Sequence, residues 1–159
     1  MSRTVLAVCL LALLMGVIAG LRTMTAAAAV SWAAHLGWLD LRGTWLAFLG
    51  YAWTPWIMSV LALGELVADQ LPSTPSRTVP LGFGARIVSG AVVGAAIGAP
   101  SRAIVVGAVA GIVGAIIGTL GGHAARARLT AGFGSDRPAA FIEDAVAIGG
   151  ALLIVVALR

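Results

Sequence analysis

The chain has 159 residues, of which 60% are hydrophobic and only 10% are charged. This composition excludes a disordered chain and a soluble globular domain, and it predicts one all-α integral membrane domain over residues 1–159. The formal net charge is +4, carried by ten arginines and no lysine. Because the arginines cluster at the ends of apolar segments, orientation in a membrane explains this charge better than binding to nucleic acid.

An apolar run from Thr4 to Gly20 predicts the first transmembrane helix. Arg3 precedes this run and imitates the start of a signal peptide, but an uncleaved signal anchor is the preferred interpretation. The next segment, Leu21–Leu39, is polar at its start and short for a crossing. We therefore expect a re-entrant or broken helix near residues 21–39, with a full crossing as the alternative.

Four more apolar segments follow, which gives about five transmembrane helices, or six if residues 21–39 cross. These segments are Thr44–Leu71, Gly84–Ala99, Ala103–Gly122 and Ala139–Leu158. Prolines predict a loop over residues 72–80, and Pro100–Arg102 predicts a tight turn. With five crossings, which we prefer, the arginines place the N-terminus in the cytoplasm; with six they favour an N-terminus outside.

Glycines recur every three or four residues in two of these segments. Such ridges let helix backbones approach closely in lipid, where apolar burial no longer drives association. They predict helix packing within the chain, and a homodimer interface is the alternative. The glycines concerned are Gly90, Gly94, Gly98, Gly107, Gly111, Gly114, Gly118 and Gly122.

A weak internal repeat relates Gly16–Ala26 to Gly114–Ala124, and an apolar segment with an acidic pair follows each copy. With five crossings, the second copy would be inverted relative to the first. Inverted repeats that meet near the bilayer midplane build many transporters, so the pattern predicts this architecture. Chance similarity between glycine- and alanine-rich segments is the alternative.

Two acidic pairs lie within or against the apolar segments. Glu65 and Asp69 are four residues apart, so they share a helix face and could bind a cation or share a proton. Alternatively, they form an interfacial pair with Arg77 or Arg86. Glu143 and Asp144 cannot both face lipid cheaply, so at least one should point into the bundle. Their alternative role is to stabilise the start of a helix.

Arg22 precedes Thr23 and Thr25 at the start of an alanine-rich segment. If either threonine caps a half-helix there, its N-terminus and Arg22 would form an anion site. A snorkelling arginine at the end of the first helix is the alternative. The two histidines lack ligand spacing, and neither a nucleophile motif nor a phosphate loop is present. We therefore expect no metal site, no cofactor and no enzyme of a soluble type.

Three motifs together resemble an uncharacterised family of small bacterial polytopic membrane proteins, known as a domain of unknown function. The first is Gly-Leu-Arg-Thr from Gly20, which opens the stretch to Ala34. The second is Glu-x-x-x-Asp-x-x-Pro-x-x-Pro-Ser-Arg-Thr from Glu65, and the third is the Glu-Asp pair at Glu143. The resemblance covers nearly the whole chain. It implies a polytopic protein of the bacterial inner membrane and supplies no reaction.

These patterns favour a small transporter or channel-like protein, expected as a homodimer in the lipid bilayer, with a polar midplane site for a small ion or solute. The alternatives are a non-catalytic membrane scaffold or partner subunit, and an intramembrane enzyme that modifies lipid with an acid–base pair. The candidate binding residues are Arg22, Thr23, Thr25, Glu65, Asp69, Arg77, Glu143 and Asp144.

Overall fold

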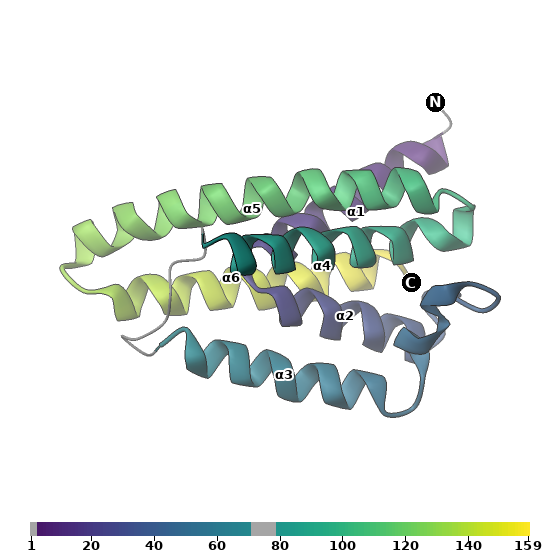
Figure 1. The fold of residues 1–159 in the computed structure, drawn as a ribbon, viewed down its shortest axis with the longest axis horizontal. Coiled ribbons are helices and arrows are strands. Elements are labelled where there is room, and N and C mark those ends of the chain that lie inside the picture. The colour runs from purple at the N-terminus through teal and green to yellow at the C-terminus, as the bar shows by residue number, and fades with distance from the viewer. Residues whose placement is uncertain (1–2, 71–78) are drawn as a thin grey trace.

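A computed structural model describes residues 3–70 and 79–159, and in these ranges the chain folds into helices joined by short connections. The helices are α1 (Arg3–Leu21), α2 (Thr23–His35), α3 (Thr54–Ala68), α4 (Pro80–Gly98), α5 (Ile104–Phe133) and α6 (Asp136–Ala157), with short 3-10 helices η1 (Trp45–Gly50) and η2 (Ala99–Ser101). They form an elongated bundle (Figure 1). The prediction of a polytopic all-α membrane protein is confirmed.

Among the described residues, four helices are long and apolar enough to cross a membrane: α1, α4, α5 and α6. Their outer faces carry exposed large apolar side chains such as Leu6, Val105 and Leu153, which suits contact with lipid. With 13 and 15 residues, α2 and α3 are shorter than the ~20 residues that a full crossing needs.

The helix break expected near residues 21–39 lies at Arg22. The backbone of Arg22 is extended, with φ −141° and ψ 102°, between the last residue of α1 and the first of α2. From this break α2 turns back toward the end of the bundle where α1 begins, and both termini lie at that end (Figure 1). The guanidinium of Arg159 accordingly lies 5.7 Å from the ring centre of Trp38, just beyond α2.

The direction of α5 relative to α1 differs from the preferred arrangement of five crossings. A Cβ added at Gly16 would meet Gly111, and one added at Gly20 would meet Ala115, so α1 and α5 run in the same direction. Between them α2, α3 and α4 alternate in direction (Figure 1), although α2 and α3 are shorter than a full crossing. The assignment of the N-terminus to the cytoplasm depended on five crossings and does not follow from this fold.

The same geometry corrects the expectation of an inverted repeat. The two similar segments, which begin at Gly16 and Gly114, lie side by side on α1 and α5. Since these helices are parallel, the segments are not inverted copies of each other. The reversal of direction at Arg22, which the five-crossing prediction lacked, makes the two helices parallel.

The segment Thr44–Leu71, expected as one long helix, is divided in two. Thr44 caps the short helix η1, and Tyr51 then returns to an extended backbone with ψ 151°. Helix α3 begins only at Thr54, with Pro55 in its first turn. Proline fits there because it has no N–H to donate to a helix interior. The exposed Trp45, Tyr51, Trp53 and Trp56 gather around this division, as residues of a membrane interface do.

The glycine ridges face one another inside the chain. A Cβ on Gly94 would overlap the carbonyl group of Gly107 on α5, and one on Gly111 would overlap that of Gly90 on α4. Cβ atoms on Gly114 and Gly118 would overlap the backbone of α1. Gly98 packs against the start of α5, and Gly122 is buried. These ridges therefore join α1, α4 and α5, and they are not a surface for a second copy.

Candidate functional site

The centre of the candidate site is Arg22, whose side chain is 0% exposed at the break between α1 and α2. Its Nε donates a hydrogen bond to Oδ1 of Asp144 on α6 at 2.7 Å, and Nη2 lies 2.5 Å from the same oxygen. Its Nη1 pairs with the carboxylate of Asp69, just after α3. A single guanidinium thus ties the break to two helices that are distant in sequence.

Glu65 occupies the N-terminus of α2. Its two carboxylate oxygens accept hydrogen bonds from the backbone N–H groups of Thr23 and Met24, at 2.9 and 2.8 Å. The first N–H groups of a helix have no partner within the helix, and they attract negative charge. The anion site expected beside Arg22 is therefore filled by a carboxylate of the chain itself, and no threonine caps this helix.

The other side of the break is held by Arg86 on α4. Its Nη1 donates to the carbonyl oxygens of Gly20 and Leu21, at 2.8 and 2.9 Å. These carbonyl groups end α1, where a helix lacks intrahelical donors and favours a cation. The buried Thr119 also donates to the carbonyl of Gly20, at 3.3 Å. A cation at the end of α1 and an anion at the start of α2 together compensate for the missing helical hydrogen bonds.

Arg126 on α5 extends the chain of charges. Its Nη1 lies 3.5 Å from Oδ2 of Asp69 and 3.5 Å from Oε2 of Glu143. Its Nε donates to Oδ1 of Asp136 at 2.8 Å. The charge therefore alternates in sign along the series of contacts Glu143, Arg126, Asp69, Arg22 and Asp144. We refer to these five residues as the ion network.

The structure brings together six of the eight sequence-predicted site residues around the break: Arg22, Thr23, Glu65, Asp69, Glu143 and Asp144. Thr25 lies three residues after Arg22. Its hydroxyl is buried and makes no hydrogen bond with the described residues. Arg77 lies outside the described residues. Glu65 and Asp69, which were expected to act as a pair, have different partners. Glu65 caps α2, and Asp69 pairs with arginines.

Sequence reasoning missed Arg126, and it considered Arg86 only as an alternative partner of Glu65 and Asp69 and not of the carbonyl groups that end α1. A signal for both was present in the four-residue period of the glycine ridges. Extending Gly118 and Gly122 by one step reaches Arg126, and extending Gly94 and Gly90 backwards reaches Arg86. Residues four apart share a helix face, so each arginine lies on the packed face of its helix.

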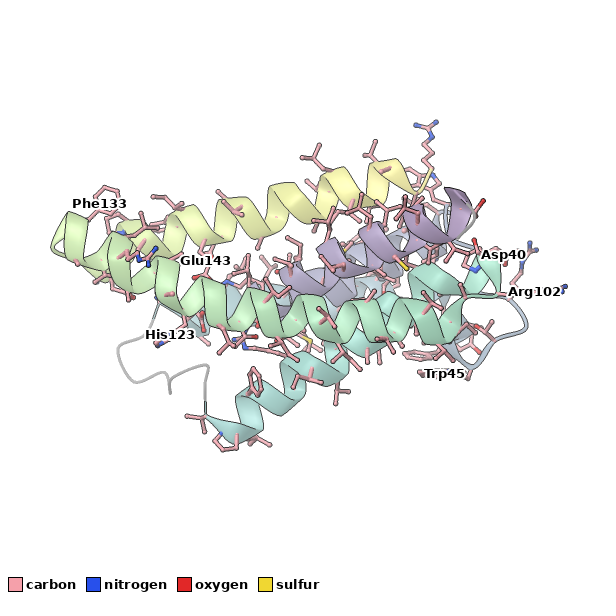
Figure 2. All side chains as sticks on the ribbon, turned by 90° about the horizontal axis from the view of Figure 1, so that it is seen from above. Asp40, Trp45, Arg102, His123, Phe133 and Glu143 are labelled. Carbon is pink, nitrogen blue, oxygen red and sulfur yellow. The ribbon has the colours of Figure 1, made fainter. Side chains whose placement is uncertain are left out.

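The helix break lies about halfway along the bundle, because Gly20 packs against Ala115 and Thr119 in the middle of α5. The 18 residues from Thr4 to Leu21 rise about 27 Å at ~1.5 Å per residue, close to the ~30 Å hydrocarbon thickness of a bilayer. Arg22 thus follows a helix long enough to cross a membrane, and the expected position of the site at the bilayer midplane stays a prediction. Figure 2 shows His123 and Glu143 in the half of the molecule toward Phe133, away from Asp40, Trp45 and Arg102.

A cavity of about 310 Å³ lies beside the ion network. It is lined by His123, Arg126, Ala127, Thr130 and Asp136. The hydroxyl of Thr130 donates to Oδ1 of Asp136 at 3.1 Å, which orients that carboxylate toward Arg126. Within residues 3–70 and 79–159, no three side chains of His, Cys, Asp or Glu are grouped to hold a metal ion. The chemistry of the site is therefore that of carboxylates, guanidinium groups and helix ends.

Comparison with known proteins adds a family but no activity. The family model described as "Domain of unknown function (DUF4126)" matches residues 9–157. No curated protein and no solved structure matches the chain.

Proposed function

This chain belongs to the DUF4126 family, a domain of unknown function, and we propose that it is a small transporter or channel-like protein that binds a small ion or polar solute at the ion network. The observation that supports this proposal is the fully buried Arg22, which lies at a helix break. Its guanidinium is bonded to two carboxylates, that of Asp69 just after α3 and that of Asp144 on α6. The proposal places the protein in the bacterial inner membrane. The homodimer stays a prediction.

Stability alone is a poor reason to keep these charges. Replacing a buried ion pair by apolar residues of similar volume is often neutral, or stabilises a protein by about 1–4 kcal/mol. Ionisable groups among apolar membrane helices are costlier still, and they commonly mark ion or solute pathways. Arg22, Asp69 and Asp144 therefore have a role that apolar side chains could not perform.

The broken helix supports the same proposal. Transporters commonly bind ions and solutes where a helix is interrupted, because the exposed N–H and carbonyl groups act as ligands. Here Glu65 and Arg86 already satisfy those groups. We propose that this is the occluded resting state, in which side chains of the protein hold the positions that a transported ion would share. Among the residues that the structure describes, no contact specifically favours the scaffold or the lipid-modifying enzyme.

The proposal can be tested by ion flux into liposomes that contain the purified protein. Asp144→Asn removes a carboxylate of the ion network, and Asp40→Asn is the matched control at the opposite end of the bundle. Hydrogen bonds from Arg42 lower the pKa of Asp40 to about 2, so the control also removes a full negative charge. We expect proton, Na⁺, K⁺ or Cl⁻ flux above that of empty liposomes, reduced at least tenfold by Asp144→Asn and unchanged by Asp40→Asn.

Glu143→Gln provides a second test if Asp144→Asn fails to yield folded protein, as judged by gel filtration. Absence of flux from the wild-type protein for every ion would contradict the proposal. So would equal flux through the wild type and both ion-network variants.

A further inference from the structure

Arg126 is the residue whose position calls for a separate explanation. It lies between the cavity and the buried carboxylates, with a side chain that is 16% exposed. On its inner side, Nη1 lies 3.5 Å from both Asp69 and Glu143. On its outer side, Nε and Nη2 donate to the two oxygens of Asp136, at 2.8 and 2.5 Å. Nη2 also donates to the backbone carbonyl of Asp69, at 3.4 Å. The inner contacts are therefore the longer ones.

Side-chain exposure changes steeply across this arginine. The Asp136 side chain is 55% exposed, and that of Glu143 is 8% exposed. Arg126 thus separates a carboxylate that meets water from carboxylates that are nearly enclosed. The cavity of about 310 Å³ lies along Arg126 and Asp136 and is large enough for several water molecules.

We propose that Arg126 and Asp136 form a gate between this cavity and the ion network, and that the ion that passes the gate is a small monovalent cation. This inference rests on the proposed function. When Asp136 draws the guanidinium toward the cavity, a cation takes its position between Asp69 and Glu143. When the guanidinium moves inward, it fills that position itself.

The charges around the gate are the reason for assigning the passing ion as a cation. The guanidinium bears one positive charge, and its Nη1 contacts two carboxylates, so that position accommodates a single positive charge. An anion that entered from the cavity would meet Asp136 first and then Asp69 and Glu143. Contacts of 3.5 Å are longer than the ~2.7–2.9 Å typical of a charge-assisted hydrogen bond. The inner contacts are therefore weaker than the outer ones, and they are the ones that exchange.

This arrangement predicts opposite effects for two conservative variants. Arg126→Gln removes the competing positive charge and should open the path to the carboxylates. Asp136→Asn removes the outer attraction, so Arg126 should settle against Asp69 and Glu143 and close the path. Arg128→Gln is the matched control, because Arg128 is an exposed arginine two residues further along the same helix.

Cysteine accessibility measures the gate independently of transport. Cys9 is the only cysteine, so Cys9→Ser provides a background without thiols. Ala140→Cys then places one thiol at a fully buried position, one turn before Glu143 on α6. We expect a cationic methanethiosulfonate to modify this thiol at least tenfold faster with Arg126→Gln and at least threefold slower with Asp136→Asn. Arg128→Gln should leave the rate within twofold. Ala139→Cys, at another fully buried position of α6, is the second reporter if Ala140→Cys does not fold.

Equal modification rates in all variants, or changes of the same sign for Arg126→Gln and Asp136→Asn, would overturn the gate. Ion flux into liposomes tests the assignment to a cation. Arg126→Gln should raise K⁺ or Na⁺ flux, and a larger rise in Cl⁻ flux would overturn the assignment. If Asp144→Asn abolishes flux while the two gate variants leave it unchanged, the gate is wrong and the proposed function stands. Absence of flux from every protein would overturn the proposed function and cation passage together.

Discussion

At the scale of single residues, the interruption of the first helix is compensated by three charged side chains. Arg86 bonds the last carbonyl groups of α1, Glu65 bonds the first N–H groups of α2, and Arg22 itself pairs with Asp69 and Asp144. An unpaired backbone group in a dry interior costs free energy comparable to a lost hydrogen bond. The break therefore persists only while these partners remain in place.

Substitution of Arg22 tests this dependence. Arg22→Gln leaves Asp69 and Asp144 without their shared cation, and breaking a buried pair typically costs about 3–5 kcal/mol. We expect a loss of this size in the free energy of unfolding, measured by denaturation in mixed micelles. Arg22→Lys should lose less, since it keeps the charge but not the guanidinium fork. The double variant Arg22→Gln/Asp144→Asn should lose less than the sum of the single variants, and strict additivity would contradict direct pairing.

Glu65 can be tested through the cap that it makes on α2. Glu65→Ala removes the acceptor for two N–H groups, and losing a helix cap costs about 0.5–2 kcal/mol. We expect faster hydrogen exchange in the peptide that contains Thr23 and Met24, measured by mass spectrometry, with no change in the second half of α6. Glu65→Gln should fall between the wild type and Glu65→Ala, because its amide has one acceptor oxygen instead of two. Unchanged exchange near Thr23 in Glu65→Ala would count against the cap.

At the scale of the elements, α1, α4 and α5 are joined by close backbone contact. Glycines on α5 face α4 at Gly107 and Gly111, and they face α1 at Gly114 and Gly118. In lipid, such contact replaces the apolar burial that packs helices in water. The long helix α5 therefore serves as the common partner of the two spanning helices that border the site.

A pair of glycine substitutions on α5 tests this packing. A Cβ on Gly111 would overlap the carbonyl of Gly90, whereas a Cβ on Gly121 would have no neighbour within 4 Å. We expect Gly111→Ala to lower the thermal midpoint of the detergent-purified protein, because backbone must move to admit the methyl group. Gly121→Ala should be neutral or stabilise the helix by up to about 1 kcal/mol, as alanine does in a helix interior. Equal midpoints for the two variants would contradict the close approach of α4 and α5.

At the scale of the whole molecule, the reversal at Arg22 determines how the chain is threaded. Helices α1 to α6 alternate in direction, so both termini and the connection that holds η1 lie at one end (Figure 1). The ion network extends from the middle of the bundle toward the other end, with Arg86, Arg126, Arg128 and Arg137 on the helices around it. An excess of arginine on one side is typical of the cytoplasmic face.

This threading predicts that both termini lie on the same side of the membrane, outside the cytoplasm. Reporters that are active on only one side of the membrane, fused before α1 or after Arg159, would show this in intact cells. A third fusion in the turn at Gly134 should report the cytoplasm. Termini on opposite sides would contradict the reversal at Arg22, and both termini in the cytoplasm would contradict the orientation alone.

The sequence by itself determined the class of protein and where its chain is interrupted. High hydrophobicity with few charges requires spanning helices, since only hydrogen-bonded helices satisfy the backbone in lipid. The polar start of residues 21–39 was sufficient to predict a break there. The acidic pairs and Arg22 were recognisable because charges stand out in apolar segments. These are local properties, and each is encoded by neighbouring residues or by a helical period.

Only the tertiary structure decided the direction of α2, the convergence of the site residues around the break, and the part played by Arg126 and Arg86. Arg22 and Asp144 are 122 residues apart, and Arg86 and Gly20 are 66 apart, so no local period records their contact. A one-residue break satisfies the same local pattern whether the next helix continues or turns back. Packing of α2 against α3 and α4 chooses between the two, and that choice places carboxylates and arginines from distant helices around one buried guanidinium.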